Sequence, residues 1–151
     1  MIVAALALAG IFLSTYLLLY KLGMIGALTC NVGSCETVNT SKWAKFLGLP
    51  VAGWGVAWYL GVFALAMAWV QERFADSRGL SLLILFMTGT GLLFSIYLTW
   101  LELFVIHAIC QWCVVSAIMV LVMFVLVVLD YRTADAGEVA ELNPRPPVSG
   151  N

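Results

Sequence analysis

Long apolar stretches that lack Asp, Glu, Lys and Arg dominate the hydrophobic pattern of the chain. They cover residues 1–20, 46–70, 80–101 and 103–129, so each contains 20 residues or more. A helix that crosses the hydrocarbon core of a bilayer needs roughly 20 residues, and it satisfies its backbone hydrogen bonds within the segment. The pattern therefore predicts an all-α membrane protein, a bundle of four transmembrane helices at about 1–20, 50–70, 80–106 and 112–130.

The composition agrees with a membrane protein. Hydrophobic residues make up 64% of the 151 residues and charged residues 10%, whereas soluble domains average about 45–50% and about 25%. The net charge of −1, without blocks of like charge, gives no indication of nucleic-acid binding. The length fits one domain. We predict a catalytic membrane domain at 1–131 and a disordered cytoplasmic tail at 132–151, which is rich in Pro, Gly and small polar residues.

The first apolar segment is either a retained helix or a cleaved signal peptide. No Lys or Arg precedes its apolar run, and no A-x-A cleavage site follows it. A signal peptide typically has both a positively charged start and such a cleavage site. We therefore favour a retained helix.

The connections between the predicted helices bring the cysteines to one membrane face. Loop 21–49 is long, and the turn near 107–111 is short and uncharged. Two predicted helices separate the loop from the turn, so both lie at the same face. That face then carries all four cysteines of the chain, which are Cys30 and Cys35 in the loop and Cys110 and Cys113 at the turn.

Charge and cysteine usage predict the orientation. Cytoplasmic loops carry an excess of Lys and Arg. The cysteine face has three basic residues and the opposite face has four: Lys21, Lys42 and Lys45 against Arg73, Arg78, Arg132 and Arg145. Paired cysteines also fit an oxidising compartment. We expect a multi-pass protein of the inner (plasma) membrane, with the cysteine face outside and both termini cytoplasmic.

The sequence AICQWC places Cys110 and Cys113 where the last predicted helix begins. The unpaired N–H groups of a helix N-terminus carry partial positive charge, which stabilises a thiolate and lowers the pKa of a cysteine. With two residues between them, the sulfurs can meet within one turn and alternate between dithiol and disulfide. Because the motif borders hydrocarbon, we predict that it reacts with an apolar oxidant.

The sequence CNVGSC places Cys30 and Cys35 in an aqueous loop, with the flexible Gly33 between them. A soluble partner can reach this pair. One exposed pair and one buried pair together predict a relay by thiol–disulfide exchange. The residues alone leave two alternatives open, in which both pairs are structural disulfides or the four cysteines hold one zinc ion.

Two stretches together resemble the vitamin K epoxide reductase family in its bacterial branch: CNVGSCETVNTSKWAKFLGLPVAGWG and, far downstream, SIYLTWLELFVIHAICQWC. The resemblance covers residues from about 10 to 130. It consists of the loop cysteine pair, a Ser six residues after the second loop cysteine, Gly-Leu-Pro before the second helix, and the late C-x-x-C. Another family of quinone-linked disulfide oxidases has the reverse order, with C-x-x-C in the first loop.

The resemblance implies a four-helix bundle around a quinone of the menaquinone or ubiquinone type, with no metal. Cys113 would touch the quinone, and Cys110 would exchange with Cys35. Cys30 would pair with Cys35 and face the partner. Ser41 matches the serine that lies near the active site in this family. The implied partner is a periplasmic or extracellular thioredoxin-fold protein, which the membrane enzyme oxidises.

The chain departs from the vertebrate members of that family at two positions. Those members use an Asn and a Tyr to hydrogen-bond the vitamin K head group. The matching positions here lie near Val51 and at Ala117. Without these donors, a quinone-dependent thiol oxidase that generates disulfides is the favoured function. The alternatives are a vitamin K epoxide or quinone reductase of a recycling pathway, and a non-catalytic membrane protein with structural disulfides or zinc.

Further residues are expected around the cysteines. The stretch TSKWAKFLGLP predicts a short amphipathic surface helix that forms a lid over the cysteine site. Trp112 lies within the C-x-x-C, and we predict that it supports the quinone pocket together with Ser41, Val51 and Ala117.

Glu102 is the one acidic residue between positions 80 and 129. Acidic residues at membrane depth are often functional, so Glu102 is a possible proton relay to a reduced quinone. The alternative is a structural bond to a neighbouring hydroxyl. His107 lies near the membrane surface, where we expect a solvated or capping role rather than a catalytic one.

Overall fold

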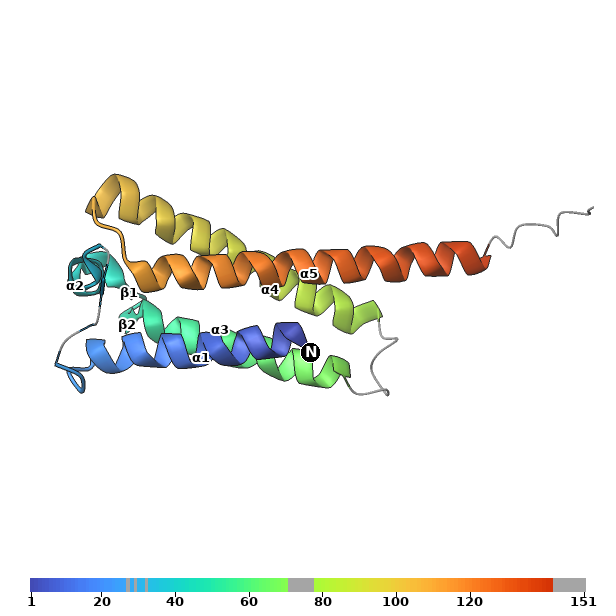
Figure 1. Ribbon diagram of the computed structural model, residues 1–151, viewed down its shortest axis with the longest axis horizontal. Helices are drawn as coiled ribbons and strands as arrows, with labels where there is room; N and C mark the ends of the chain where they lie inside the picture. Colours follow the sequence, from blue (N-terminus) through green and yellow to red (C-terminus); the bar gives the residue numbers. More distant parts are fainter. Residues whose placement is uncertain (27, 29, 32, 71–77, 143–151) are drawn as a thin grey trace, which may run out of the picture.

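The fold is a bundle of long helices. The computed structural model describes residues 1–26, 28, 30–31, 33–70 and 78–142, with side chains as far as position 133. Within these residues, four helices are long and apolar enough to cross a membrane. They are α1 (Ile2–Lys21), α3 (Val51–Val70), α4 (Arg78–Leu101) and α5 (Gln111–Leu142) (Figure 1). A π-helical turn, η2 (Glu102–Ile106), continues α4. The predicted all-α membrane bundle is confirmed.

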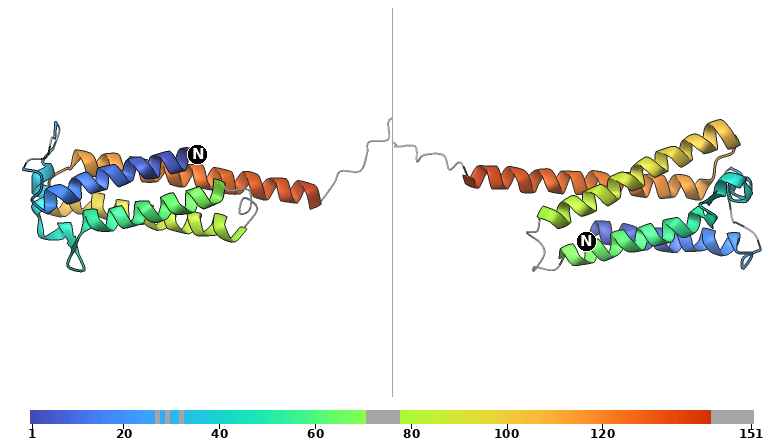
Figure 2. Two further views of the ribbon diagram at one scale, coloured as in Figure 1. Left: turned by 90° about the horizontal axis from the view of Figure 1, so that it is seen from below. Right: turned by 180° about the vertical axis from the view of Figure 1, so that it is seen from behind.

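The helices pack as two antiparallel pairs. α1 lies along α3, and α4 lies along α5, while contacts of α1 with α5 and of α3 with α4 join the pairs (Figures 1 and 2). Small and aliphatic side chains fill the far end of the bundle, and Ala, Val and Met side chains pack with the Tyr59 ring in the middle. A third cluster at the opposite end contains Leu17, Leu28 and Val38 together with Cys35 and Cys110. Two of the cysteines are therefore part of the buried core.

The cysteine-bearing loop and the turn before α5 lie at the same end of the bundle (Figure 1). Gly33 of the loop pairs with Cys110 of the turn in an isolated antiparallel bridge. The expectation from counting helices is confirmed by this direct contact.

The segment that follows the loop cysteines differs from the prediction. It contains a short helix α2 (Cys35–Thr40), a 3₁₀ turn η1 (Lys42–Ala44) and a hairpin of β1 (Lys45–Phe46) and β2 (Leu49–Pro50). The prediction of a surface helix over TSKWAKFLGLP is wrong, and the helix of this loop begins earlier, at the second loop cysteine.

The hairpin forms because its turn and its ring contacts override the helical pattern. Leu47 and Gly48 both have positive φ, 52° and 82°, as a two-residue type I′ hairpin turn requires. Phe46 makes edge contacts with Trp54 and Phe94, and the Trp54 indole donates a hydrogen bond to the Phe46 carbonyl oxygen at 3.1 Å. These contacts fix the segment against α3 and α4.

Helix α5 extends further than predicted. It ends at Leu142 rather than near residue 130. Ala, Glu and Leu in the stretch TADAGEVAEL are good helix formers, so the helix continues past the membrane-length segment. The rest of the predicted tail, 143–151, lies outside the described residues.

Candidate active site

Backbone hydrogen bonds hold the loop cysteines against the C-x-x-C turn. The N–H of Ser34 donates to the carbonyl oxygen of Ile109 at 3.0 Å, and the N–H of Asn31 donates to the Gln111 side chain at 3.2 Å. Gly33, with φ of +86°, lies between these bonds, and a Cβ there would overlap the Ile109 carbonyl oxygen. Only glycine adopts this conformation readily and allows such a close approach.

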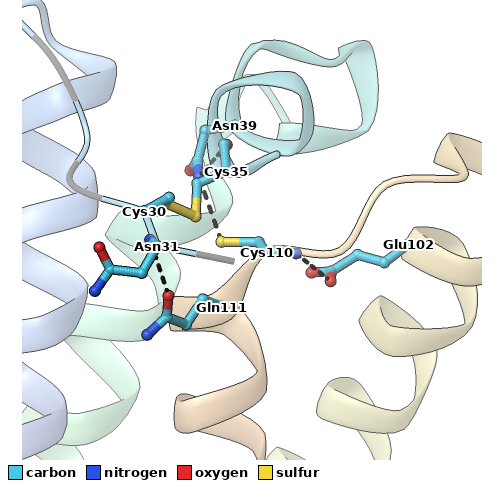
Figure 3. The surroundings of a disulfide bond; sticks show 7 residues. All are labelled: Cys30, Asn31, Cys35, Asn39, Glu102, Cys110 and Gln111. Carbon is cyan, nitrogen blue, oxygen red and sulfur yellow. Dashed lines mark hydrogen bonds between the residues drawn. A yellow bond between two sulfur atoms is a disulfide. The ribbon is translucent and has the colours of Figure 1, made fainter. Parts of the chain in front are cut away.

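The loop pair forms a disulfide. Cys30 and Cys35 are bonded, with their Cα atoms 6.4 Å apart (Figure 3). Cys30 is half-buried, whereas Cys35 is only 1% exposed and is the first residue of α2. The pairing that the resemblance implied is present, and its two sulfurs differ in access.

Cys110 is a free thiol that is fully buried. The side-chain amide of Asn39 donates a hydrogen bond to its sulfur at 3.9 Å and another to the carbonyl oxygen of Cys35 at 3.0 Å (Figure 3). A hydrogen bond from the Cys113 thiol is the largest cause of a lowered pKa of Cys110, while burial and the nearby Glu102 oppose it. Cys110 thus lies between the loop disulfide and its C-x-x-C partner.

Glu102 reaches the C-x-x-C turn because the chain reverses after it. The π-helical turn ends at His107, whose φ of 54° is left-handed and whose N–H bonds back to the Glu102 carbonyl oxygen. The Glu102 carboxylate, 5% exposed, then accepts the N–H of Cys110 at 3.0 Å and interacts with the Cys113 thiol. The structural alternative for Glu102 named a hydroxyl partner, whereas its carboxylate accepts a hydrogen bond from this backbone N–H. His107 is exposed and occupies the C-cap position of this turn, within the solvated or capping role expected from the sequence.

A cavity of about 410 Å³ lies beside the cysteines, within the bundle. Its volume falls in the range of roughly 300–1,000 Å³ that is typical of small-molecule sites. Cys113 and Glu102 line it, and so do three residues that the sequence assigned to the pocket: Ser41, Val51 and Ala117. Trp43, Ala44 and Phe46 also line it, so the segment predicted as a lid borders the cavity, although not as a helix.

Trp112 lies elsewhere. Its ring makes an edge contact with Tyr16 at 5.9 Å between centroids, and it packs against the cluster around Leu17 and Cys35. It is absent from the described residues that line the cavity. The assignment of Trp112 to the quinone pocket is therefore not supported by this geometry.

The cavity fits a flat, largely apolar ring with polar substituents. Indole and phenyl groups of Trp54, Trp58 and Phe94 form much of its wall. One turn below Cys113, the hydroxyls of Tyr59 and Ser116 lie 2.8 Å apart and both line the cavity. A quinone combines these properties, because its ring is flat and its two oxygens accept hydrogen bonds. The sequence alone did not assign Tyr59, Ser116 or Asn39 to the site.

The family assignment agrees with this arrangement. The sequence model of the vitamin K epoxide reductase family matches residues 1–128. The chain belongs to the vitamin K epoxide reductase family. Membership makes it a membrane oxidoreductase of disulfide and quinone chemistry, with a quinone and a thiol redox partner. The match includes all four cysteines and every residue that lines the cavity.

The zinc alternative does not fit this state of the cysteines. The Cys30–Cys35 disulfide leaves two free thiols, Cys110 and Cys113. Among the residues that the structure describes, no group of three or more His, Cys, Asp or Glu side chains could hold a metal ion.

Proposed function

We propose that this protein is a membrane thiol oxidase, of the bacterial branch of its family, that generates disulfides in a thioredoxin-fold partner. The main support is that the four sulfurs differ stepwise in how accessible they are from the protein surface and from the cavity. Cys30 is half-buried at the surface, Cys35 and Cys110 are buried beside each other in one cluster, and Cys113 lines the cavity. A relay needs this order, because each sulfur then meets only its neighbours.

The first half of the relay oxidises the partner. A partner thiolate attacks Cys30, and Cys35 leaves as a thiolate. The second partner thiol then attacks the mixed disulfide, so the partner gains a disulfide and Cys30 is released. The loop pair is now a dithiol, which holds the two electrons that the partner has lost.

The second half passes the electrons inward. Cys35 attacks Cys110 of the Cys110–Cys113 disulfide, and Cys113 leaves as a thiolate. Cys30 next attacks Cys35, which releases Cys110. The product has a loop disulfide and a C-x-x-C dithiol, the same bonding as in the structure.

The last step returns the C-x-x-C pair to a disulfide. A quinone bound in the cavity supplies an acceptor for two electrons and two protons. Cys113 lines that cavity, and Glu102 lines it too while interacting with the Cys113 thiol. We assign to Glu102 the transfer of thiol protons into the cavity. Its carboxylate contacts both Cys110, through the backbone N–H, and Cys113, through the thiol.

Quinone reduction is favoured over epoxide reduction by the cavity wall. At the two positions where vertebrate relatives have Asn and Tyr, Val51 and Ala117 present only methyl groups to the cavity. Vitamin K epoxide turnover by the purified protein would argue for the reductase alternative.

The proposal includes the orientation of the protein in the membrane and the compartment in which it meets its partner. Lys21, Lys42 and Lys45 lie at the cysteine end, whereas Arg78 and Arg132 flank the segments at the opposite end. The sequence has three Lys, all before the second long helix, and four Arg, all after it. By the positive-inside rule, this small excess favours the Arg-bearing side as the cytoplasmic one. We propose that the cysteine end faces the periplasm or the extracellular space, where oxidised partners are found.

The test measures quinone reduction by the purified protein in detergent. A reduced thioredoxin-fold protein and a small membrane-permeable dithiol serve as alternative electron donors. The wild type should use both donors. Cys35→Ala should lose the reaction with the protein donor but keep the reaction with the small dithiol, which reaches Cys113 through the cavity. Cys113→Ala should lose both.

Two results would overturn this function. If Cys113→Ala retained quinone-dependent thiol oxidation, the C-x-x-C would not be the site that delivers electrons to the quinone. If the wild type reduced no quinone with either donor, the cysteines would have a structural purpose.

A further inference from the structure

The side-chain amide of Asn39 lies between the two cysteine pairs. Its Nδ2 donates to the carbonyl oxygen of Cys35 at 3.0 Å and to the sulfur of Cys110 at 3.9 Å (Figure 3). The residue is 8% exposed. An amide nitrogen has two hydrogens, so one faces the loop disulfide residue and the other faces the sulfur of the C-x-x-C pair.

The position of Asn39 is fixed from several sides. Cys35 is the first residue of α2, and Asn39 follows one turn later, so both lie on the same face of the helix. Lys21 of α1 donates a hydrogen bond to the backbone carbonyl of Asn39. The Ser41 hydroxyl donates to the Val38 carbonyl oxygen at 2.8 Å and closes the end of α2. The amide is therefore held against Cys110 before any charge develops there.

We propose that Asn39 is a catalytic residue of the internal exchange, in which its amide stabilises the negative charge on the Cys110 sulfur. The inference rests on the proposed relay and names a residue that drives one of its steps. In that step the Cys30 thiolate attacks Cys35 of the Cys35–Cys110 mixed disulfide. The Cys30–Cys35 bond forms, the Cys35–Cys110 bond breaks, and Cys110 leaves with the electron pair as a thiolate.

A hydrogen bond distinguishes the thiolate from the disulfide sulfur. Hydrogen bonds to an ionised acceptor are roughly twice as strong as those between neutral groups. The Asn39 amide therefore stabilises the leaving thiolate more than it stabilises the mixed disulfide. In the reverse step the amide raises the fraction of Cys110 that is thiolate at neutral pH, and this gain exceeds the loss in nucleophilicity, so Asn39 accelerates exchange in both directions.

The titratable groups that face Cys110 are Cys113 from α5 and Glu102 from η2. Lys21 from α1 reaches the backbone of Asn39 rather than the sulfur. Cys113→Ala removes the thiol donor to Cys110. Among the described side chains, Asn39 then remains as a donor to that sulfur, so its effect can be measured separately.

The experiment follows exchange in the full-length Cys113→Ala protein with its loop disulfide formed. Attack of Cys110 on Cys35 forms the mixed disulfide and releases the Cys30 thiol, which an excess of membrane-impermeant maleimide traps. Mass spectrometry gives the rate of trapping as a function of pH. In this background Asn39→Leu removes the donor, and Asn39→Asp keeps the shape without the N–H groups. Thr40→Val is the matched control, since it removes the exposed bond from Thr40 to the Glu36 carbonyl oxygen in the same helix.

We expect Asn39→Leu to raise the pH midpoint of the rate by about one unit and to slow trapping at neutral pH about threefold, because fewer Cys110 side chains are thiolates while each thiolate is more nucleophilic. Asn39→Asp should not restore either value, because a carboxylate adds like charge beside the thiolate. Thr40→Val should stay within about twofold of its parent.

Three outcomes would overturn the proposal. If both Asn39 variants showed the same rate and pH midpoint as Thr40→Val, Asn39 would have no role in the exchange. If Asn39→Asp restored the rate of trapping, the shape of the side chain rather than its N–H groups would support the exchange. Release of no Cys30 thiol from the parent would instead refute the relay itself, and with it the function on which the inference rests.

Discussion

Gly33→Ala tests whether the backbone bridge between the loop and the C-x-x-C turn is what allows electrons to pass. Gly33 pairs with Cys110, and the next residue, Ser34, bonds to the Ile109 carbonyl oxygen at 3.0 Å. An alanine Cβ at position 33 would approach that oxygen far more closely than the 3.0 Å that real Cβ atoms keep. The loop must then move away from the turn, which separates Cys35 from Cys110.

The magnitude follows from two contributions. A left-handed φ costs an L-residue about 1–2 kcal/mol. Loss of the Ser34–Ile109 hydrogen bond adds about 0.5–1.5 kcal/mol. Together they disfavour the docked loop by about 1.5–3.5 kcal/mol, which lowers its docking equilibrium roughly 10- to 400-fold, since 1.4 kcal/mol is about tenfold.

Gly23→Ala is the matched control. Gly23 also has a left-handed φ, of +74°, but nothing lies within 4 Å of the position where its Cβ would be built. It therefore carries the backbone strain alone. The difference between the two variants isolates the contact with Ile109.

The assay compares quinone reduction with the two electron donors used above. For Gly33→Ala we expect turnover with the thioredoxin-fold donor to fall at least tenfold, while turnover with the small dithiol stays within about twofold. Gly23→Ala should retain most of both activities. If Gly33→Ala kept full activity with the protein donor, the loop would not need to dock on the turn. If it lost both activities, the bridge would support the fold rather than the exchange.

Two further substitutions test the cavity. Glu102→Gln keeps an oxygen acceptor for the Cys110 N–H but cannot carry a proton, so single-turnover quinone reduction should slow by about 100-fold or more; an unchanged quinone rate would leave Glu102 with a positioning role only. Tyr59→Phe removes one hydroxyl of the pair with Ser116, so the KM for quinone should rise about fivefold with little change in kcat; an unaltered KM would mean that the quinone does not contact this pair.

The helices were predictable because the bilayer leaves the backbone few choices. A segment without charged residues that is long enough to cross hydrocarbon must be a helix. The number of such segments then decides which loops share a face. The Gly33–Cys110 bridge is the direct confirmation of that reasoning.

The position of Trp112 could have been predicted from helical geometry. Successive residues of a helix are about 100° apart. Cys113, Ser116 and Ala117 are spaced three and four residues apart, so they share the face that lines the cavity. Trp112 is about 100° from Cys113, at the edge of that face, and its ring meets Tyr16 of α1. Nearness to a cysteine in sequence was a poor guide to where the ring lies.

The contacts of Glu102 and Asn39 were not predictable from local sequence. Counting along a helix places Glu102 about 12 Å from Cys110, but the left-handed turn at His107 folds the chain back and brings the carboxylate to the Cys110 N–H. Asn39 faces Cys110 because α2 starts at Cys35, whereas the apolar pattern placed the helix further on. Ring contacts of Phe46 with α3 and α4 stabilise a hairpin in that later segment instead of a helix.

The burial of Cys110 explains why a relay needs two cysteine pairs rather than one. Cys110 is fully buried, and Cys113 opens toward a cavity lined mainly by apolar and aromatic side chains. A folded partner protein cannot reach either sulfur there, whereas a small dithiol can enter the cavity. Half-buried Cys30 is the sulfur within reach of a protein, so electrons from a protein must cross the Cys35–Cys110 contact. In the proposed relay, selectivity for protein donors resides in the loop, and oxidation by the quinone resides in the bundle. For that reason, variants of the loop should separate the two activities, and variants of the cavity should reduce both together.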